Sequence, residues 1–134
     1  FQGATEEEIT ALRAVVRPLV EDCAKQFGIT IEKITEAKKA GNLNFLDSCL
    51  YYCFFNKVGF IDSKGLFDAS TAIEKNKKYF KDEADVQNIE RIGKKCLSVN
   101  EETVSDGDKG CERSKLLLSC FLKEKADFTV FQFQ

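Results

Sequence analysis

The sequence contains no histidine and no tryptophan, and it has only one proline. Without histidine, the chain cannot form the Ser-His and Cys-His pairs that commonly activate a nucleophile. A zinc ion would have to be held by four cysteine thiolates. The longest hydrophobic runs are far shorter than a membrane span. We therefore expect a protein that is not an enzyme and that requires no cofactor and no metal.

The charges also exclude one class of partner. Lysine and arginine number 20 against 22 acidic residues, giving a net charge of −2 with both signs scattered along the chain. No basic stretch indicates binding to nucleic acid. The first three residues, Phe1-Gln2-Gly3, resemble the end of a protease-cleavage tag. We expect residues 1–3 to be a tag remnant and residues 4–134 to form a single domain.

Six cysteines in a chain of 134 residues favour disulfide bonds and an oxidising compartment. No signal peptide is visible, which is typical of the mature form of a secreted protein. Both features predict an extracellular protein.

Hydrophobic spacing and helix-capping residues predict an all-α chain with six helices and short connections. No alternation of polar and apolar residues is long enough to predict a sheet. The expected helices run from Thr5 through Cys23, from Thr30 to Ala40, from Phe45 (capped by Asn44) to about Val58, from about Asp68 to Phe80, from Asp82 to Cys96 and from about Lys109 to Lys123, with a polar loop from Val99 to Asp108.

Helix geometry limits how the cysteines can pair. Cys49 and Cys53 lie about 40° apart on one helix face, so each is better placed to bond a neighbouring element. Cys111 and Cys120 lie near opposite faces of a continuous helix, roughly 13 Å apart along its axis. Several of the fifteen possible pairings remain open. A four-thiolate zinc site is the alternative, although the CxxC pairs typical of such sites are missing.

The cysteine order resembles that of the insect odorant-binding proteins, the family that carries pheromones and general odorants. The resemblance rests on Cys49-x3-Cys53 and Cys111-x8-Cys120, with 25 residues between the first cysteine and Cys49. The gap of 14 residues between Cys96 and Cys111 lies at the long side of the family pattern. The resemblance covers nearly the whole chain.

This resemblance implies six helices around an internal apolar cavity, stapled by three interlocked disulfides. It implies binding and carrying of small hydrophobic ligands, such as odorants and pheromones, through extracellular fluid; in an olfactory role this fluid would be sensillum lymph. The implied disulfides are Cys23–Cys53, Cys49–Cys111 and Cys96–Cys120.

The predicted binding residues are apolar side chains on the last four helices and on the aromatic C-terminal tail. Packing in an ordinary core is the competing interpretation for each of them. We expect the tail to pack over or near the cavity, because an exposed tail rich in phenylalanine would be adhesive. Three tyrosines, Tyr51, Tyr52 and Tyr79, are candidates for a single hydroxyl contact. The expected walls are Phe54, Phe55, Val58, Ile73, Val86, Ile89, Ile92, Leu116, Leu117 and Phe121, and the expected lid contains Phe128, Val130, Phe131 and Phe133.

Two alternative functions remain open. The chain could be a secreted carrier of lipids or amines outside olfaction, or a protein-interaction module with a solid core. An olfactory receptor membrane surface is a further partner considered, and we expect a monomer or a weak homodimer. The lack of histidine predicts that ligand binding changes little between about pH 7.5 and 5.5.

Overall fold

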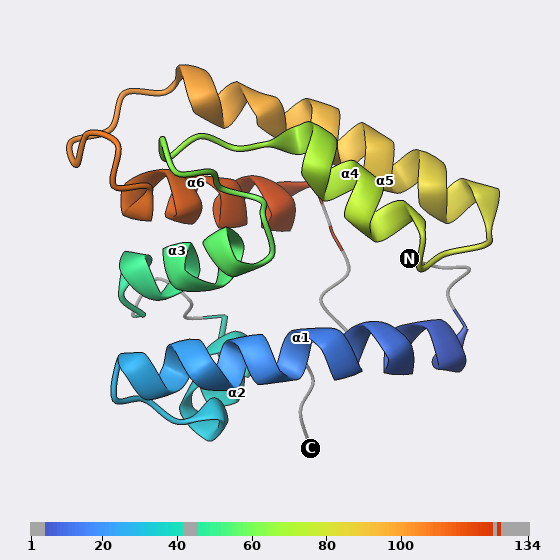
Figure 1. The fold of residues 1–134 in the computed structure, drawn as a ribbon, viewed down its shortest axis with the longest axis horizontal. Helices are drawn as coiled ribbons and strands as arrows, with labels where there is room; N and C mark the ends of the chain where they lie inside the picture. The colour runs from blue at the N-terminus through green and yellow to red at the C-terminus, as the bar shows by residue number, and fades with distance from the viewer. Residues whose placement is uncertain (1–4, 42–45, 125, 127–134) are drawn as a thin grey trace.

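The computed structural model describes residues 5–41, 46–124 and 126. Within these ranges the chain forms six α-helices and one 3-10 helix, with no strand, which confirms the all-α prediction (Figure 1). The elements are α1 (Glu6–Gln26), α2 (Ile31–Lys39), α3 (Ser48–Lys57), α4 (Ala69–Lys77), α5 (Glu83–Cys96), the 3-10 helix η2 (Leu97–Glu101) and α6 (Cys111–Lys123).

Helix α1 begins with the capping box that the sequence predicts. The Glu8 amide donates to the Thr5 hydroxyl at 3.1 Å, and the Thr5 amide donates to the Glu8 carboxylate at 3.0 Å. Acidic residues fill the first turn and Lys25 lies in the last turn, so both ends carry charges that favour the helix dipole. The helix continues through Pro18.

The start of α3 lies later than predicted. The helix begins at Ser48, and the carboxylate of Asp47 caps it by accepting the Cys49 amide at 2.8 Å. The predicted cap Asn44 and first residue Phe45 lie outside the described residues. An aspartate at this position accepts orphan amides as well as an asparagine does, so the sequence offered two caps of similar strength.

The predicted loop before α6 also differs from the structure. Its first three residues, Val99 to Glu101, belong to the 3-10 helix Leu97–Glu101, which continues directly from α5. Helix α6 begins at Cys111, because Gly110 just before it has a left-handed backbone with φ of 82°. A side chain at Gly110 would also meet the Tyr52 ring at 2.6 Å. Glycine at this position therefore sets where α6 begins.

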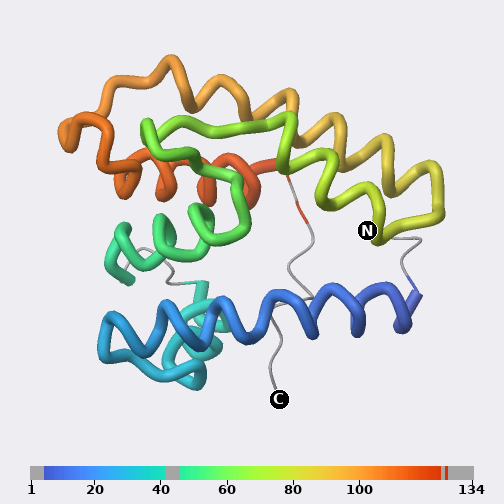
Figure 2. Tube along the Cα trace, in the orientation of Figure 1, coloured from blue at the N-terminus to red at the C-terminus, as the bar shows by residue number. Residues whose placement is uncertain are grey.

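Helix α1 lies across the molecule from the layer that contains α3, α4, α5 and α6 (Figures 1 and 2). Helix α3 packs against α6, α4 packs against α5, and α2 folds back against α1. Three disulfides join four of these helices and confirm the pairing that the family resemblance implies. They link α1 to α3, α3 to α6 and α5 to α6 through Cys23–Cys53, Cys49–Cys111 and Cys96–Cys120.

The buried side chains form two hydrophobic clusters. One lies between α3, α4, α5 and α6 and includes Phe55, Leu117 and Phe121. The other joins α1 to the start of α5 through Leu12, Val16, Val20, Phe80 and Ile89. The partly buried ring of Phe54 packs against both clusters. This ring therefore lies at the junction where α1 meets the opposite layer.

Polar contacts fix the segment between α3 and α4. The Phe67 amide donates to the Asn100 side chain at 2.8 Å, and the Asn100 amide group donates to the Phe67 carbonyl at 3.0 Å. The buried Arg113 side chain donates to the Gly65 carbonyl at 3.1 Å and to the Val99 carbonyl. Because charge-assisted bonds to buried carbonyls are strong, these contacts hold the segment against η2 and α6.

Candidate functional site

A cavity of about 370 Å³ separates α1 from α3, α4 and α5, and we call it the α4/α5 cavity. Rings form much of its inner wall. The ring centroids of Phe55 and Phe121 lie 6.0 Å apart in an edge-to-face arrangement. The rings of Phe67 and Phe121 are arranged in the same way, with centroids also 6.0 Å apart. Such pairs pack a wall densely without polar atoms. The wall can therefore receive apolar surface but offers almost nothing for hydrogen bonding.

Helix α1 supplies the opposite wall, which the sequence predictions missed. Four of its apolar side chains line the cavity at helical spacing, namely Leu12, Val15, Val16 and Leu19. Leu12 and Val16 are buried, whereas Val15 is 48% exposed and so lies near the mouth. The signal was present, since this spacing places all four side chains on one face of a helix. The sequence alone did not indicate where α1 lies relative to α4 and α5.

The structure brings most of the predicted wall residues together. Of the ten that lie in the described part of the chain, these seven line the α4/α5 cavity: Phe54, Phe55, Val58, Ile73, Ile89, Ile92 and Phe121. Leu117 is fully buried inside the larger hydrophobic cluster. Val86 and Leu116 are partly buried and pack on the outside of the clusters, and neither side chain lines the α4/α5 cavity. The predicted lid residues Phe128, Val130, Phe131 and Phe133 lie outside the described residues.

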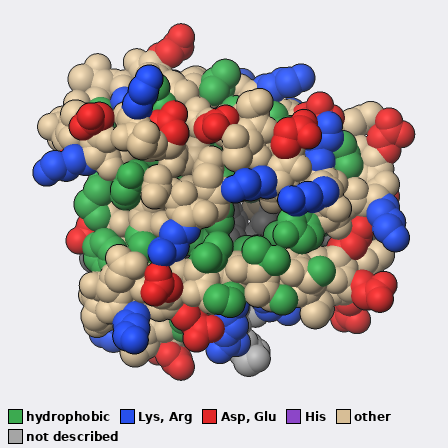
Figure 3. Space-filling model, in the orientation of Figure 1, with side chains coloured by type: hydrophobic (Ala, Val, Ile, Leu, Met, Phe, Trp, Pro, Cys, Tyr) green, Lys and Arg blue, Asp and Glu red, His purple; other side chains and the backbone are tan. Residues whose placement is uncertain are grey.

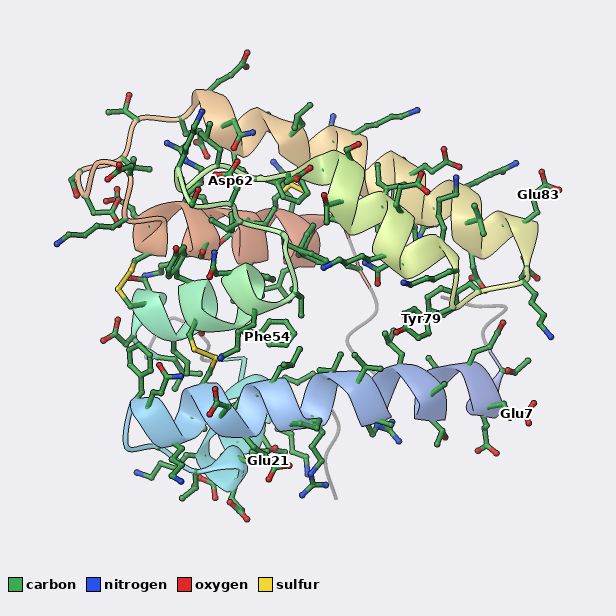
Figure 4. All side chains as sticks on the ribbon, viewed as in Figure 1. Glu7, Glu21, Phe54, Asp62, Tyr79 and Glu83 are labelled. Atoms are coloured by element: carbon green, nitrogen blue, oxygen red, sulfur yellow. A yellow bond between two sulfur atoms is a disulfide. The ribbon has the colours of Figure 1, made fainter. Side chains whose placement is uncertain are left out.

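The three tyrosines occupy different places. Tyr79 lines the α4/α5 cavity, and Figure 4 shows it and Phe54 directed into the space between α1 and the opposite layer. Tyr52 packs beside Gly110 and does not line the α4/α5 cavity. Contact of the Tyr79 hydroxyl with a ligand stays a prediction.

Three lysines contribute to the lining of the α4/α5 cavity, whereas no acidic residue of the described ranges does so. Lys57 forms an ion pair with Asp22 at 2.7 Å, and this contact lowers the pKa of the Asp22 carboxyl. Lys75 donates to the Val58 carbonyl at 3.1 Å, and Lys78 is exposed. Figure 3 shows a hollow near the centre of this face, with basic side chains along one side and hydrophobic ones along the other.

A second cavity of about 460 Å³ lies between α1, α2, α3 and α6, and we call it the α2/α6 cavity. Phe54 and Phe55 line both cavities, so these two rings separate them. The hydroxyl of Thr35 lines this cavity and has no hydrogen-bond partner among the described residues. Tyr51 also lines it, and burial raises the pKa of Tyr51 to about 12. This second cavity was not predicted from the sequence.

Apolar side chains make up most of the lining of both cavities, which is typical of sites that bind small molecules. All six cysteines are in disulfides. Among the described residues, no group of cysteine, aspartate and glutamate side chains is arranged to hold a metal ion. None of the described helices is both long and apolar enough to cross a membrane.

Comparisons with known proteins agree with this geometry. The sequence model of the PBP/GOBP family matches residues 5–124. A solved structure of an odorant-binding protein from Drosophila melanogaster is similar with a TM-score of 0.59 and 26% sequence identity. The similarity covers 87% of this chain and 93% of the fly protein. A comparison with curated protein sequences found no match.

Proposed function

The chain belongs to the PBP/GOBP family, and on that premise we propose that it binds small hydrophobic molecules in the α4/α5 cavity and carries them through extracellular fluid. The observation that carries the proposal is the cavity itself. It has about 370 Å³ of space behind a wall of aliphatic and aromatic side chains, within the usual size range of ligand pockets. The family is one of odorant and pheromone carriers, not of enzymes.

The driving force is the transfer of apolar ligand surface out of water, worth roughly 25 cal/mol per Å². Because the inner wall offers few hydrogen-bonding groups, the shape of the cavity selects the ligand, and polar groups near the mouth adjust the choice. Tyr79 and Asn76 are the uncharged polar side chains available for that adjustment.

The same proposal covers location and partners. Family members are secreted soluble proteins, and we place this chain in extracellular fluid, sensillum lymph in an olfactory role. It would act as a monomer or weak homodimer and release ligand near a receptor-bearing membrane. The two cavities argue against the alternative of an interaction module with a solid core. A non-olfactory carrier of lipids would use the same site.

Uptake of a fluorescent apolar probe such as a phenyl-naphthylamine tests the proposal. We expect saturable uptake by the full-length protein and displacement by volatile alcohols and long-chain alcohols. The chain has no tryptophan, so its own emission interferes little with the signal. Failure of the protein to take up probe would contradict the carrier function.

A pair of filling variants locates the site. Ala72 is buried and lines the α4/α5 cavity, and Thr35 lines the α2/α6 cavity. Ala72→Phe should fill the first cavity and reduce probe uptake strongly, whereas the matched Thr35→Phe should leave displaceable uptake in place. The reverse order would assign the ligand to the α2/α6 cavity, and thermal unfolding of both variants checks that each is folded.

A further inference from the structure

In the part of the chain that the structure describes, every charged side chain that lines either cavity is a lysine, although the whole chain carries a net charge of −2. Three of these lysines belong to the α4/α5 cavity: Lys57 at the end of α3, Lys75 within α4, and Lys78 just after α4. Acidic residues slightly outnumber basic ones in the sequence. The lining of the cavity therefore differs in charge from the surface of the molecule as a whole.

The three lysines differ in whether a carboxylate neutralises their charge. Asp22 neutralises Lys57 at 2.7 Å. Lys75 bonds only an uncharged carbonyl, that of Val58, so its positive charge remains. Among the described residues, no carboxylate lies within ion-pair distance of Lys75 or Lys78. Two cations therefore stand beside an apolar space without a described counter-ion.

Building on the proposed function, we propose that the preferred ligands are aliphatic chains that end in a carboxylate, with the chain inside the α4/α5 cavity and the carboxylate at Lys75 and Lys78. Both lysines are exposed, so the carboxylate keeps part of its hydration and need not be buried at full cost. The nearby side chain of Val15, 48% exposed, offers apolar surface for the first part of the chain. The same two cations disfavour amine ligands.

The position of Lys75 is fixed by its neighbours. Its ammonium group lies over the turn that ends α3, where a side chain on Gly59 would approach the Lys75 nitrogen to 2.9 Å. The positive φ of 80° at Gly59 favours glycine, whose lack of a side chain leaves room for the ammonium group. The ammonium is therefore held in place before a ligand binds, which reduces the entropy lost on binding.

Displacement of bound phenyl-naphthylamine by decanoate, decanol and decylamine tests the inference, since these ligands share one chain length and differ in charge. At pH 7.5 and low salt we expect decanoate to bind best and decylamine worst. Lys78→Gln should lower the ratio of decanoate to decanol affinity roughly two- to fivefold, the usual scale for an exposed ion pair. Added salt should lower the same ratio, because it screens exposed charges.

Lys77→Gln is the matched control, because Lys77 lies on α4, pairs with Glu74 at 3.9 Å and lines neither cavity. Thermal unfolding of Lys75→Gln is measured alongside its ligand affinity, because the Lys75 side chain also donates a hydrogen bond to the carbonyl at the end of α3. Equal affinity for decanoate and decanol in the unaltered protein, or an equal effect of Lys77→Gln, would overturn the inference. If none of the three ligands displaces the probe, the carrier function itself fails.

Discussion

The two cavities share two phenylalanine rings, but their walls are held together by different means. Most of the α2/α6 cavity lies between α1, α3 and α6, and two disulfides join these three helices. Cys23, one end of the Cys23–Cys53 bridge, itself lines this cavity. Covalent bonds therefore limit how far these walls can separate.

The α4/α5 cavity is bounded differently. Helix α4 contains no cysteine, and no disulfide joins the first half of α1 to α5 or to the segment before it. These parts meet through packing of Leu12 and Val16 against Phe80 and Ile89 and through the Lys81 amide, which donates to the Glu8 carboxylate at 2.9 Å. Packed side chains can shift by small amounts at low cost, whereas a disulfide fixes the distance between two backbones. The cavity proposed for the ligand therefore lies between helices whose packing can adjust. It lies beside α1, α3 and α6, whose separation is limited by disulfides.

Removing the Cys23–Cys53 disulfide should have the largest effect on this contrast. The double variant Cys23→Ala with Cys53→Ala should lower the free energy of unfolding by about 2–5 kcal/mol. It should also increase hydrogen exchange in α2 and in the last turns of α1, because the α2/α6 cavity loses a covalent wall. Denaturant unfolding and hydrogen-exchange mass spectrometry measure the two effects.

The control for that prediction is removal of the bridge between Cys96 and Cys120, neither of which lines a cavity. It should destabilise the protein by a similar amount but increase exchange mainly in α5 and α6. If both variants gave the same pattern of hydrogen exchange, the Cys23–Cys53 disulfide would have no particular role in holding the walls of the α2/α6 cavity.

The second prediction joins the two cavities. Phe54→Ala removes a ring that lines both and packs on both hydrophobic clusters. Because the ring is only partly buried, we expect a loss of about 2–3 kcal/mol in unfolding free energy, below the usual range for a fully buried phenylalanine. Hexadecanol should gain affinity relative to octanol in probe displacement, since the joined space accepts a longer chain.

Phe27→Ala provides the comparison for loss of a ring, because Phe27 is 38% exposed and lines neither cavity. It should leave the preference for chain length unchanged. An unchanged preference in Phe54→Ala as well would mean that the two spaces stay separate without this ring.

The third prediction narrows the α4/α5 cavity alone. A methyl group at Gly93 would lie 2.7 Å from Cγ1 and 2.8 Å from Cδ1 of Ile73, so Gly93→Ala must displace the isoleucine side chain. We expect a several-fold loss of probe affinity and a change in unfolding free energy of about 1 kcal/mol, since alanine also favours the helix. Adding Ile73→Ala, which removes both Cγ1 and Cδ1, should restore part of the affinity. No rescue would mean that the methyl group acts elsewhere.

Much of the fold could be predicted because local features determine it. The capping box at Thr5 set the start of α1, and the family's cysteine pattern implied the pairing of all three disulfides. Boundaries were less certain where two capping residues compete, as Asn44 and Asp47 do before α3. The 3-10 helix at Leu97–Glu101 was missed because five residues are too few to show a helical periodicity.

The candidate site could be predicted only in part, for a physical reason. An apolar residue on a helix reads the same in sequence whether it fills a core, as Leu117 does, or lines a cavity, as Ile89 does. That distinction depends on how far apart the helices lie, which no single helix encodes. The wall from α1 and the lysines at Lys75 and Lys78 were missed for the same reason, since only the assembled fold places them beside α4 and α5.

The fourth prediction concerns acid, and its expected effect is small. Hydrogen bonds from neighbouring groups lower the pKa of the carboxyl groups of Glu8, Asp22 and Glu112. A lowered pKa means that these groups stabilise the fold above about pH 4.5 and lose that contribution only as the pH falls further. Decanol affinity should therefore change by less than about twofold between pH 7.5 and 5.5. The donors are the Thr5 amide for Glu8, the Lys57 ammonium for Asp22 and the Ser105 hydroxyl for Glu112.

Probe displacement by decanol across that pH range measures the effect. A tenfold loss of affinity would show that a group titrates near the cavity despite the absence of histidine. Decanoate is the instructive contrast, because its own carboxyl group ionises at about pH 4–5, like a glutamate side chain. Its affinity should stay high down to pH 5.5 and fall toward that of a neutral ligand in stronger acid.

The smallest predicted effect concerns the ionisation of one tyrosine, which distinguishes the two cavities. Burial raises the pKa of Tyr51, which lines only the α2/α6 cavity, to about 12. In the unfolded chain the same phenol ionises near pH 10, so its contribution to stability is intact below about pH 10 and is lost as the pH rises toward 12. A titration of phenolate absorbance should show one late phase that Tyr51→Phe removes. Tyr52→Phe, on the same helix but lining neither cavity, should keep that phase, and its loss there would show that the α2/α6 cavity does not bury Tyr51.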